Sequence, residues 1–278
     1  MKLLLRNVGK TFTTSNSKML ALRDINLEIN SGDFVCLVGP SGCGKSTLLN
    51  LIAALDKPTK GEILINDKPL IKPGTDRVMI FQENSLFPWL NVEQNVEFGL
   101  KVNGVGKKER QEIAHHYLKM VHLSSFRNSY VHELSGGMKQ RVALARALAL
   151  NPEVLLMDEP FAAVDSQTRD LLHEELQEIW TLTNKTIVFI THNVNEAVIL
   201  GNRVIVMSVR PGGIKKEFTI SFARPRKLDI ELVRIANLIN EELKDEIDKV
   251  VKEELDEDWA ASKKRILRQS YRDLGAGI

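Results

Sequence analysis

Short apolar runs are the clearest pattern along this chain, and they predict the buried strands of a parallel sheet. Each run is almost wholly apolar, as expected of strands that are covered on both faces. Helical stretches separate the later runs, which indicates parallel strands joined by crossover helices and therefore an α/β fold. The four main runs are Phe34–Val38, Val154–Met157, Thr186–Ile190 and Val204–Met207. Shorter runs at Leu3–Leu5 and Ile25–Ile29 predict further strands near the start.

The middle of the chain has a pattern typical of amphipathic helices. Residues 86–151 place Leu, Val and Ala at helical spacing against faces rich in Glu, Lys and Gln. We expect a helical subdomain of about residues 86–151, inserted in an α/β domain that spans residues 1–222. We interpret Arg210–Gly213 as a turn near the end of that domain.

Residues 223–278 are expected to form a charged, mostly helical C-terminal tail. Apolar residues recur every three or four positions from Leu232 to Ile247, which predicts an amphipathic helix. We favour a helix that packs on the core and then frays. The alternative is a regulatory segment or one that docks on a membrane partner.

Composition limits the classes of function. The 278 residues are 43% hydrophobic and 27% charged, as in ordinary globular proteins, and the formal net charge is only +2. Such a charge gives no strong field toward nucleic acid or anionic lipid. No apolar run approaches the roughly 20 residues of a membrane-spanning helix, and the start lacks the core of a signal peptide. Contact with a membrane is therefore expected to go through a partner, and a reduced, cytosolic chain is the expectation.

A glycine-rich segment follows the first long apolar run, with the spacing of a phosphate-binding loop. Gly39–Ser46 matches the pattern G-x-x-x-x-G-K-[ST] between a predicted strand and a predicted helix. Glycines let backbone N–H groups turn inward around phosphate oxygens, and the helix N-terminus adds its positive dipole end. Lys45 is placed to reach the β- and γ-phosphates, and the Ser46 hydroxyl to ligate Mg²⁺. A turn without a ligand is the weaker interpretation in this context.

Two acids end the second long apolar run, at the strand edge where parallel sheets bind ligands. Asp158 is placed to hold Mg²⁺ beside a phosphate loop. Glu159 points to the other side of the strand path and can orient or deprotonate an attacking water. A solvated acidic turn is the alternative, which the phosphate loop upstream disfavours.

A second segment with the character of an anion site lies far from the first. Ser135 fits the N-cap of a helix that reaches about Leu150, and Gly136 and Gly137 leave the N–H groups of its first turn accessible. Taken alone, this segment is more simply a capped helix with a flexible lead-in. A nucleotide would need both sites at its γ-phosphate, yet one chain carries them far apart.

These segments resemble the motifs of the nucleotide-binding subunit of ABC transporters, in that family's order and over about residues 3–222. Gly39–Ser46 resembles its Walker A, Val154–Glu159 its Walker B and Leu134–Arg141 its signature. The further matches are Gln82 to the Q-loop, Phe161–Asp165 to the D-loop (with Val164 where the family usually has Leu), His192 to the switch histidine, and Phe12 to the aromatic residue that stacks on adenine. Phe12 stands where the family usually has Tyr, and it keeps the aromatic face.

The resemblance implies a P-loop ATPase core with a parallel sheet, an N-terminal antiparallel β subdomain and an inserted α-helical subdomain that carries the signature. ATP and Mg²⁺ are the implied cofactors, bound between the Walker A of one chain and the signature of a second in a head-to-tail dimer. The implied catalytic residues are Glu159, His192, Gln82 and Lys45, and the implied metal-binding residues are Ser46, Gln82 and Asp158. The implied nucleotide contacts are Phe12, Gly39, Pro40, Ser41, Gly42, Cys43, Gly44, Lys45, Ser46, Thr47, Gln82, Ser135, Gly136, Gly137 and Asp158.

The implied partners are a second copy of the chain or a paired ABC subunit, and a membrane permease at whose cytoplasmic face the chain is peripheral. A periplasmic or lipid-anchored substrate-binding protein is an indirect partner, and no nucleic acid is expected. Asp76–Leu90 and Ala223–Arg226 resemble the branch that imports nitrate, aliphatic sulfonates and taurine. Two alternatives stay open: an ABC protein that acts on the ribosome or DNA, which usually carries two cassettes or a long coiled-coil insertion, and an exporter motor, which shares the chemistry.

Two further segments admit two interpretations each. Phe87–Leu90 is either a core patch of the helical subdomain or, as the resemblance suggests, part of a groove for the permease. Cys43 lies beside Lys45 at a helix N-terminus, which favours a thiolate. We hypothesise that Cys43 is the reactive thiol and that Cys36, in a buried strand, is inert. The alternative is that Cys43 packs inward as a small apolar residue.

Overall fold

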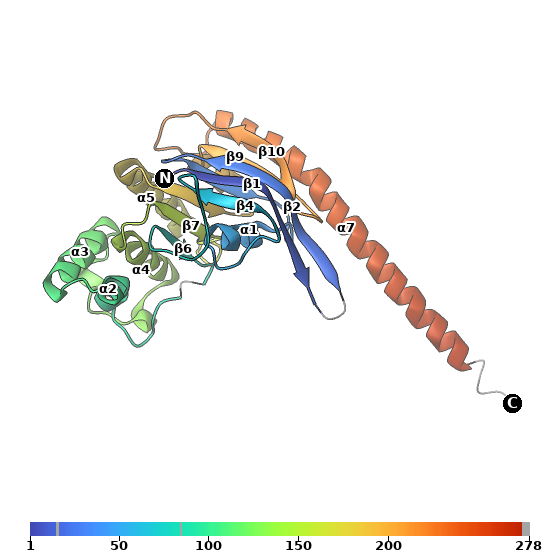
Figure 1. Cartoon of the computed structure of the whole chain (residues 1–278), viewed down its shortest axis with the longest axis horizontal. Helices are drawn as coiled ribbons and strands as arrows, with labels where there is room; N and C mark the ends of the chain where they lie inside the picture. The colour runs from blue at the N-terminus through green and yellow to red at the C-terminus, as the bar shows by residue number, and fades with distance from the viewer. Residues whose placement is uncertain (15–16, 84, 274–278) are drawn as a thin grey trace.

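The computed structural model describes residues 1–14, 17–83 and 85–273, with side chains up to Lys252. A six-stranded sheet lies at the centre, in the order β10-β9-β3-β8-β7-β6 (Figure 1). Its strands are β3 (Phe34–Val38), β6 (Arg77–Ile80), β7 (Val154–Asp158), β8 (Thr186–Ile190), β9 (Arg203–Ser208) and β10 (Gly213–Thr219). All neighbouring pairs are parallel except β9 and β10, which confirms the predicted parallel core.

A second, antiparallel sheet is built mainly from the N-terminal part of the chain. Its order is β2-β1-β4-β5, with β1 (Leu3–Thr13), β2 (Lys18–Ile29), β4 (Lys60–Ile65) and β5 (Lys68–Pro69). β1 continues well beyond the predicted Leu3–Leu5. The prediction was too short because register shifts against β2 interrupt the alternation of buried and exposed residues along the strand. Its far end carries Phe12.

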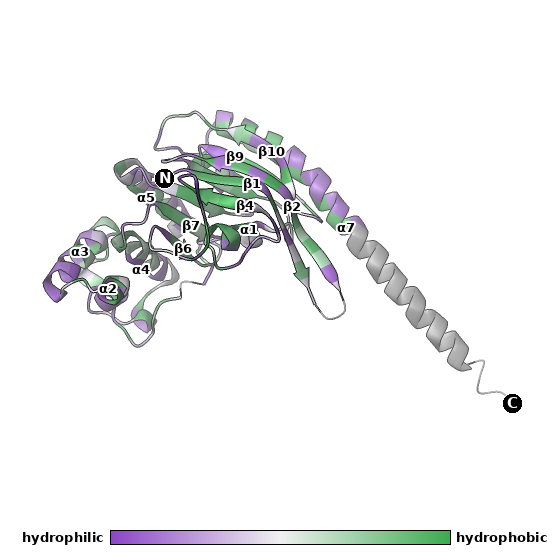
Figure 2. Ribbon diagram, viewed as in Figure 1, coloured by the Kyte–Doolittle hydropathy of each residue, from purple (hydrophilic) through white to green (hydrophobic). Residues whose placement is uncertain are grey.

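Helix α1 (Lys45–Ile52) joins the two sheets through one apolar core. Leu48, Leu49 and Ile52 are buried in a cluster that also contains residues of β1, β2 and β3. Helices α5 (Ser166–Thr183) and α6 (Val194–Leu200) contribute to a second cluster. Figure 2 shows the hydrophobic colouring concentrated in the strands of both sheets. The phosphate loop is therefore held between a fully buried strand and a buried helix.

The helical subdomain lies between β6 and β7. It contains α2 (Val92–Val102), α3 (Lys107–Met120), α4 (Gly136–Ala149) and the short 3₁₀ turns η1 (Ser124–Phe126) and η2 (Val131–Glu133). The side chain of Ser135 caps α4 by accepting a hydrogen bond from the backbone N–H of Met138 at 3.3 Å. The buried Asn95 side chain accepts from the N–H of Phe87 at 2.9 Å and donates to nearby carbonyls, which fixes the loop that leads into α2.

The C-terminal segment packs on the core before it extends away from it. The buried Arg226 guanidinium donates hydrogen bonds to the carbonyls of Val198, Gly201, Ile220 and Phe222. Helix α7 (Ile230–Asp273) then buries Leu232, Ala236, Ile239 and Leu243 in the main core cluster. Ile247, which the periodicity places on the same stripe, is half exposed, and α7 continues past the body of the molecule (Figure 1).

Candidate functional site

A cavity of about 780 Å³ opens beside the phosphate loop. It is bounded by the loop and the start of α1, by the ends of β1 and β2, and by segments that follow β7 and β9. The lining residues are Phe12, Lys18, Met19, Leu20, Ala21, Ser41, Gly42, Gly44, Lys45, Ser46, Thr47, Glu159, Arg210 and Pro211. Eight of these residues were predicted from sequence, from Phe12 through the loop to Glu159.

Backbone geometry makes the phosphate loop a turn that depends on glycine. Gly42 and Gly44 have φ values of 77° and 94°, a region that L side chains rarely adopt. A Cβ added at Gly39 would lie 2.6 Å from the sulfur of Cys43. The Lys45 ammonium donates to the carbonyls of Gly39 at 2.7 Å and Pro40 at 3.1 Å, so its position is fixed by the loop itself.

Asp158 lies at the end of β7 and contacts the start of α1. Its carboxylate is hydrogen-bonded to the Ser46 hydroxyl. Burial raises the pKa of Asp158 and the neighbouring Glu159 charge adds to the rise, while Ser46 and Lys45 oppose it. A carboxylate and a hydroxyl beside a phosphate loop are oxygen donors of the kind that Mg²⁺ takes together with substrate phosphates. Within the described part of the chain, no cluster of three or more His, Cys, Asp or Glu side chains could hold a metal ion by itself.

Glu159 and His192 follow neighbouring strands and contact each other, and of the two only Glu159 is among the residues that line the cavity. Glu159 follows β7 with a φ of 45°, and its N–H donates to the carbonyl of Ile190 at 3.0 Å. The Glu159 carboxylate lies 3.2 Å from Nδ1 of His192. The structure thus brings together an acid that faces the cavity and an imidazole two residues beyond β8.

The signature residues lie elsewhere on the molecule and do not line this cavity. Ser135 and Gly136 are exposed at the start of α4, while Gly137 is buried beside Thr168 of α5. Gln82 is exposed in the loop after β6, and it also falls outside the lining residues. Within one chain, therefore, residues of the phosphate loop line the cavity, while the signature residues lie away from it.

The hypothesis of a reactive Cys43 is wrong. Its side chain is fully buried in the core cluster that joins the two sheets. Burial raises the pKa of the thiol, and the nearby Lys45, 3.8 Å from the sulfur, opposes this without reversing it. Cys43 is not among the residues that line the cavity. Cys36 is also buried, and its pKa is strongly raised by desolvation, as expected of an inert thiol.

Sequence reasoning missed one part of the cavity wall. Arg210 and Pro211, interpreted as a plain turn, line the cavity together with Met19 and Leu20. The turn is held by the N–H of Gly212, which donates to the carbonyl of Ala21 at 2.9 Å. No local sequence pattern signals this contact, because its two partners lie far apart in the chain.

The sequence pattern of the family described as ABC transporter matches residues 22–162. The chain is 48% identical over 253 residues to an uncharacterized ABC transporter ATP-binding protein of Methanocaldococcus jannaschii, covering 91% of this chain and 95% of that protein. It is 52% identical to a nitrate import ATP-binding protein of Synechocystis, over 80% and 83% of the two chains. It is 44% identical to a taurine import ATP-binding protein of Roseobacter denitrificans, over the same shares.

A solved structure extends this similarity to three dimensions. A dimeric ATP-binding cassette in a post-hydrolysis state, bound to ADP and phosphate, matches with a TM-score of 0.70 and 37% identity, over 80% of this chain and 100% of that one. These comparisons confirm the predicted fold class and the predicted resemblance to the nitrate and taurine branch. They do not favour a ribosomal, DNA-directed or exporting protein. Across the described residues, no helix has both the length and the apolar character to cross a membrane.

Proposed function

We propose that this chain, which belongs to the ABC transporter family, is the ATP-hydrolysing subunit of an importer for a small anion. The observation that carries this proposal is the cavity itself, which combines the phosphate loop, an aromatic ring and an acid at a strand end. Each of these features suits one part of ATP or its hydrolysis.

Nucleotide binding is assigned to Phe12 and the phosphate loop. The Phe12 ring lies on the cavity wall with the Lys10 ammonium 5.0 Å from its centroid, and adenine would stack on the ring. The N–H groups of Ser41–Thr47 would surround the phosphates. Lys45 would exchange the carbonyls of Gly39 and Pro40 for phosphate oxygens, which are stronger partners for an ammonium.

Hydrolysis is assigned to Glu159 with His192 beside it. Glu159 would accept a proton from the attacking water as a general base. His192 would hold that carboxylate in place through the 3.2 Å contact and would reach the γ-phosphate. Ser46 and Asp158, joined by Gln82 from its loop, would hold Mg²⁺. When bound, this ion would neutralise phosphate charge and fix the phosphate geometry.

A head-to-tail dimer would complete the site. Ser135, Gly136 and Gly137 lie at the N-terminus of α4, where backbone N–H groups and the helix dipole favour an anion. Because these residues do not line the cavity of their own chain, we assign them to the nucleotide held by the partner. The dimer found in the related cassette supports this arrangement.

The helical subdomain is the expected contact with the permease. A cavity of about 500 Å³ there is lined by Trp89, Phe98 and neighbouring polar residues, and Trp89 is 70% exposed. The Phe87 ring packs on Phe98 with centroids 4.3 Å apart. The same loop, residues 81–91, carries Gln82 at its start, so movement at the nucleotide could reach this groove. The chain would then act as a peripheral subunit at the cytoplasmic face of the membrane.

The cargo is proposed to be nitrate, taurine or another aliphatic sulfonate, because relatives named for nitrate and taurine import are among the similar chains. The test is reconstitution of the chain with its permease and substrate-binding protein in liposomes. ATPase activity should rise when nitrate or taurine is added with the binding protein, and Trp89→Ala should lose that stimulation. A purified chain that binds no ATP, or that isolates with ribosomes and no membrane protein, would overturn the proposal.

A further inference from the structure

We infer that Glu246, on the C-terminal helix α7, positions the loop Val209–Gly212 and thereby sets how tightly the chain binds nucleotide. The inference rests on the proposed function in taking nucleotide as the ligand of the 780 Å³ cavity.

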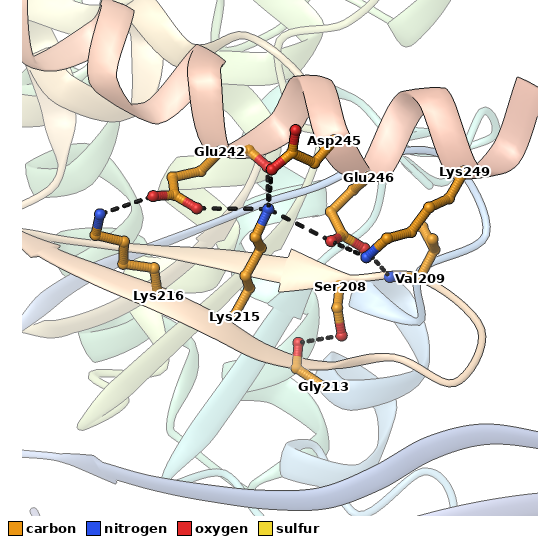
Figure 3. A network of polar contacts seen from close by, with 9 residues as sticks. All are labelled: Ser208, Val209, Gly213, Lys215, Lys216, Glu242, Asp245, Glu246 and Lys249. Atoms are coloured by element: carbon orange, nitrogen blue, oxygen red, sulfur yellow. Dashed lines mark hydrogen bonds and ion pairs between the residues drawn. The ribbon is translucent and has the colours of Figure 1, made fainter.

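Glu246 is a buried carboxylate at the point where α7 meets this loop. Its side chain is only 1% exposed, and Oε2 accepts a hydrogen bond from the backbone N–H of Val209 at 3.0 Å (Figure 3). The ammonium groups of Lys249 and Lys215 lie 2.6 Å and 3.4 Å from its other oxygen. Burial alone would raise the pKa of Glu246, but these partners bring it below its usual value, so the buried group is ionised.

The residues after Val209 form a wall of the nucleotide cavity. Arg210 and Pro211 both line it. Arg210 has a φ of 36°, which is an unfavourable conformation for a residue with a side chain. A strained backbone persists only where its surroundings hold it. The hydrogen bond that Glu246 accepts from the N–H of Val209, the residue before Arg210, is one of the contacts that hold it.

The far end of the loop is fixed against the nucleotide site itself. The N–H of Gly212 donates to the carbonyl of Ala21, and the N–H of Arg23 donates to the carbonyl of Gly212, both at 2.9 Å. Gly212 also lies so close to the phosphate loop that an added Cβ would collide with the carbonyl oxygen of Cys43. The short loop is therefore held between α7 on one side and the phosphate loop on the other. A shift of α7 would move the cavity wall.

Glu242, one turn earlier on α7, provides a comparison that distinguishes positioning of the loop from docking of the helix on β10. Its carboxylate pairs with Lys216 at 2.7 Å and with Lys215 at 3.4 Å, and both lysines belong to β10 (Figure 3). Glu242 thus shares Lys215 as an ion-pair partner with Glu246, but its carboxylate pairs with β10 and not with the backbone of the loop. If the network only docked α7, losing either acid would affect stability and leave nucleotide binding alone.

The experiment compares full-length wild type with Glu246→Ala, Glu246→Gln and Glu242→Ala, after thermal unfolding has shown which variants are folded. Binding of ATP and ADP is titrated by calorimetry, and kcat and KM are measured separately. Glu246→Ala should weaken both nucleotides about tenfold, equivalent to about 1.4 kcal/mol, with kcat at saturation within about twofold. Glu246→Gln keeps an acceptor for the Val209 N–H, so it should recover most of the affinity, and Glu242→Ala should bind like wild type.

Hydrogen exchange on the wild-type chain gives a second measurement that needs no variant. Because coupling between sites is reciprocal, saturating ADP should slow exchange at the Val209 amide and across α7 around Glu246. The inference is overturned if folded Glu246→Ala binds nucleotide like wild type, if Glu242→Ala weakens binding equally, or if ADP leaves that exchange unchanged. A wild-type chain that binds no nucleotide would instead overturn the proposed function.

Discussion

Nδ1 of His192 lies 3.2 Å from Oε2 of Glu159, so the two residues proposed for hydrolysis contact each other across neighbouring strands. β7 and β8 are paired in register up to Asp158 and Ile190, which fixes the distance between the segments that follow them. The His192 side chain is 66% exposed and that of Glu159 is 23% exposed. The imidazole can therefore turn toward a phosphate while the carboxylate stays at the cavity.

Glu159→Gln should separate ATP binding from hydrolysis. The amide keeps the size of the side chain and a contact with His192, but it cannot take a proton from water. We expect ATP hydrolysis to fall at least about 100-fold, the lower range for loss of a general base. ATP should still bind and should now hold two chains together. Phosphate release and the mass measured by light scattering with Mg-ATP check both outcomes.

Glu153→Gln is the matched control for that variant. Glu153 is a half-exposed acid that pairs with the N-terminus 3.5 Å away and does not line the cavity. Its substitution should leave hydrolysis and mass unchanged. Normal hydrolysis by Glu159→Gln would remove Glu159 from its proposed role.

Phe12→Ala should weaken ATP binding, and Phe12→Tyr should not. The proposed contact is one face of the ring, and an aromatic pair contributes about 0.5–1.5 kcal/mol beyond its buried area. KM for ATP should therefore rise roughly 2- to 12-fold in the alanine variant, with kcat little changed. Phe126→Ala removes an equally exposed ring outside the cavity and should have no effect. An unchanged KM in Phe12→Ala would exclude stacking at this position.

Cys43 should resist alkylation in the folded protein at pH 8, with or without Mg-ATP, and should react once the chain is unfolded in guanidinium. Burial raises its pKa in the fold above the ordinary thiol value of about 8.5. Because the folded state raises this pKa, it favours the neutral thiol. The resulting contribution to the free energy of unfolding is fully present below the ordinary pKa of the thiol, and it is lost as pH rises through the raised pKa of the folded state. Peptide mapping after maleimide treatment checks the prediction, and nucleotide-sensitive labelling of Cys43 in the native chain would contradict it.

The residues whose positions follow from local patterns were predictable, and those fixed by distant contacts were not. Lys45 and Glu159 each follow an apolar strand, and parallel strands carry such residues to one edge of a sheet. The predicted reactivity of Cys43 was wrong, because the helix dipole and Lys45 can be recognised locally in the sequence, whereas burial of the thiol depends on the surrounding core. The roles proposed for Arg210 and Glu246 could not be predicted from local sequence. Glu246 meets the loop that contains Arg210 only when α7 packs on the sheet.

In the proposed dimer, one nucleotide is shared between the phosphate loop of one chain and the signature of another. Lys45→Ala damages the first half and Ser135→Arg, at the exposed start of α4, blocks the second, so each variant alone should be nearly inactive. A mixed dimer gathers both lesions in one site and leaves the other intact. An equal mixture should therefore recover up to about a quarter of the normal ATPase rate, because half of the randomly formed dimers keep one of two sites.

The steady-state ATPase rate of the two variants, measured alone and mixed in equal amounts, decides whether the site is shared. With a shared site, the mixture should be several times faster than either variant alone. Full activity of Ser135→Arg by itself would contradict it, because the signature would then have no part in the site.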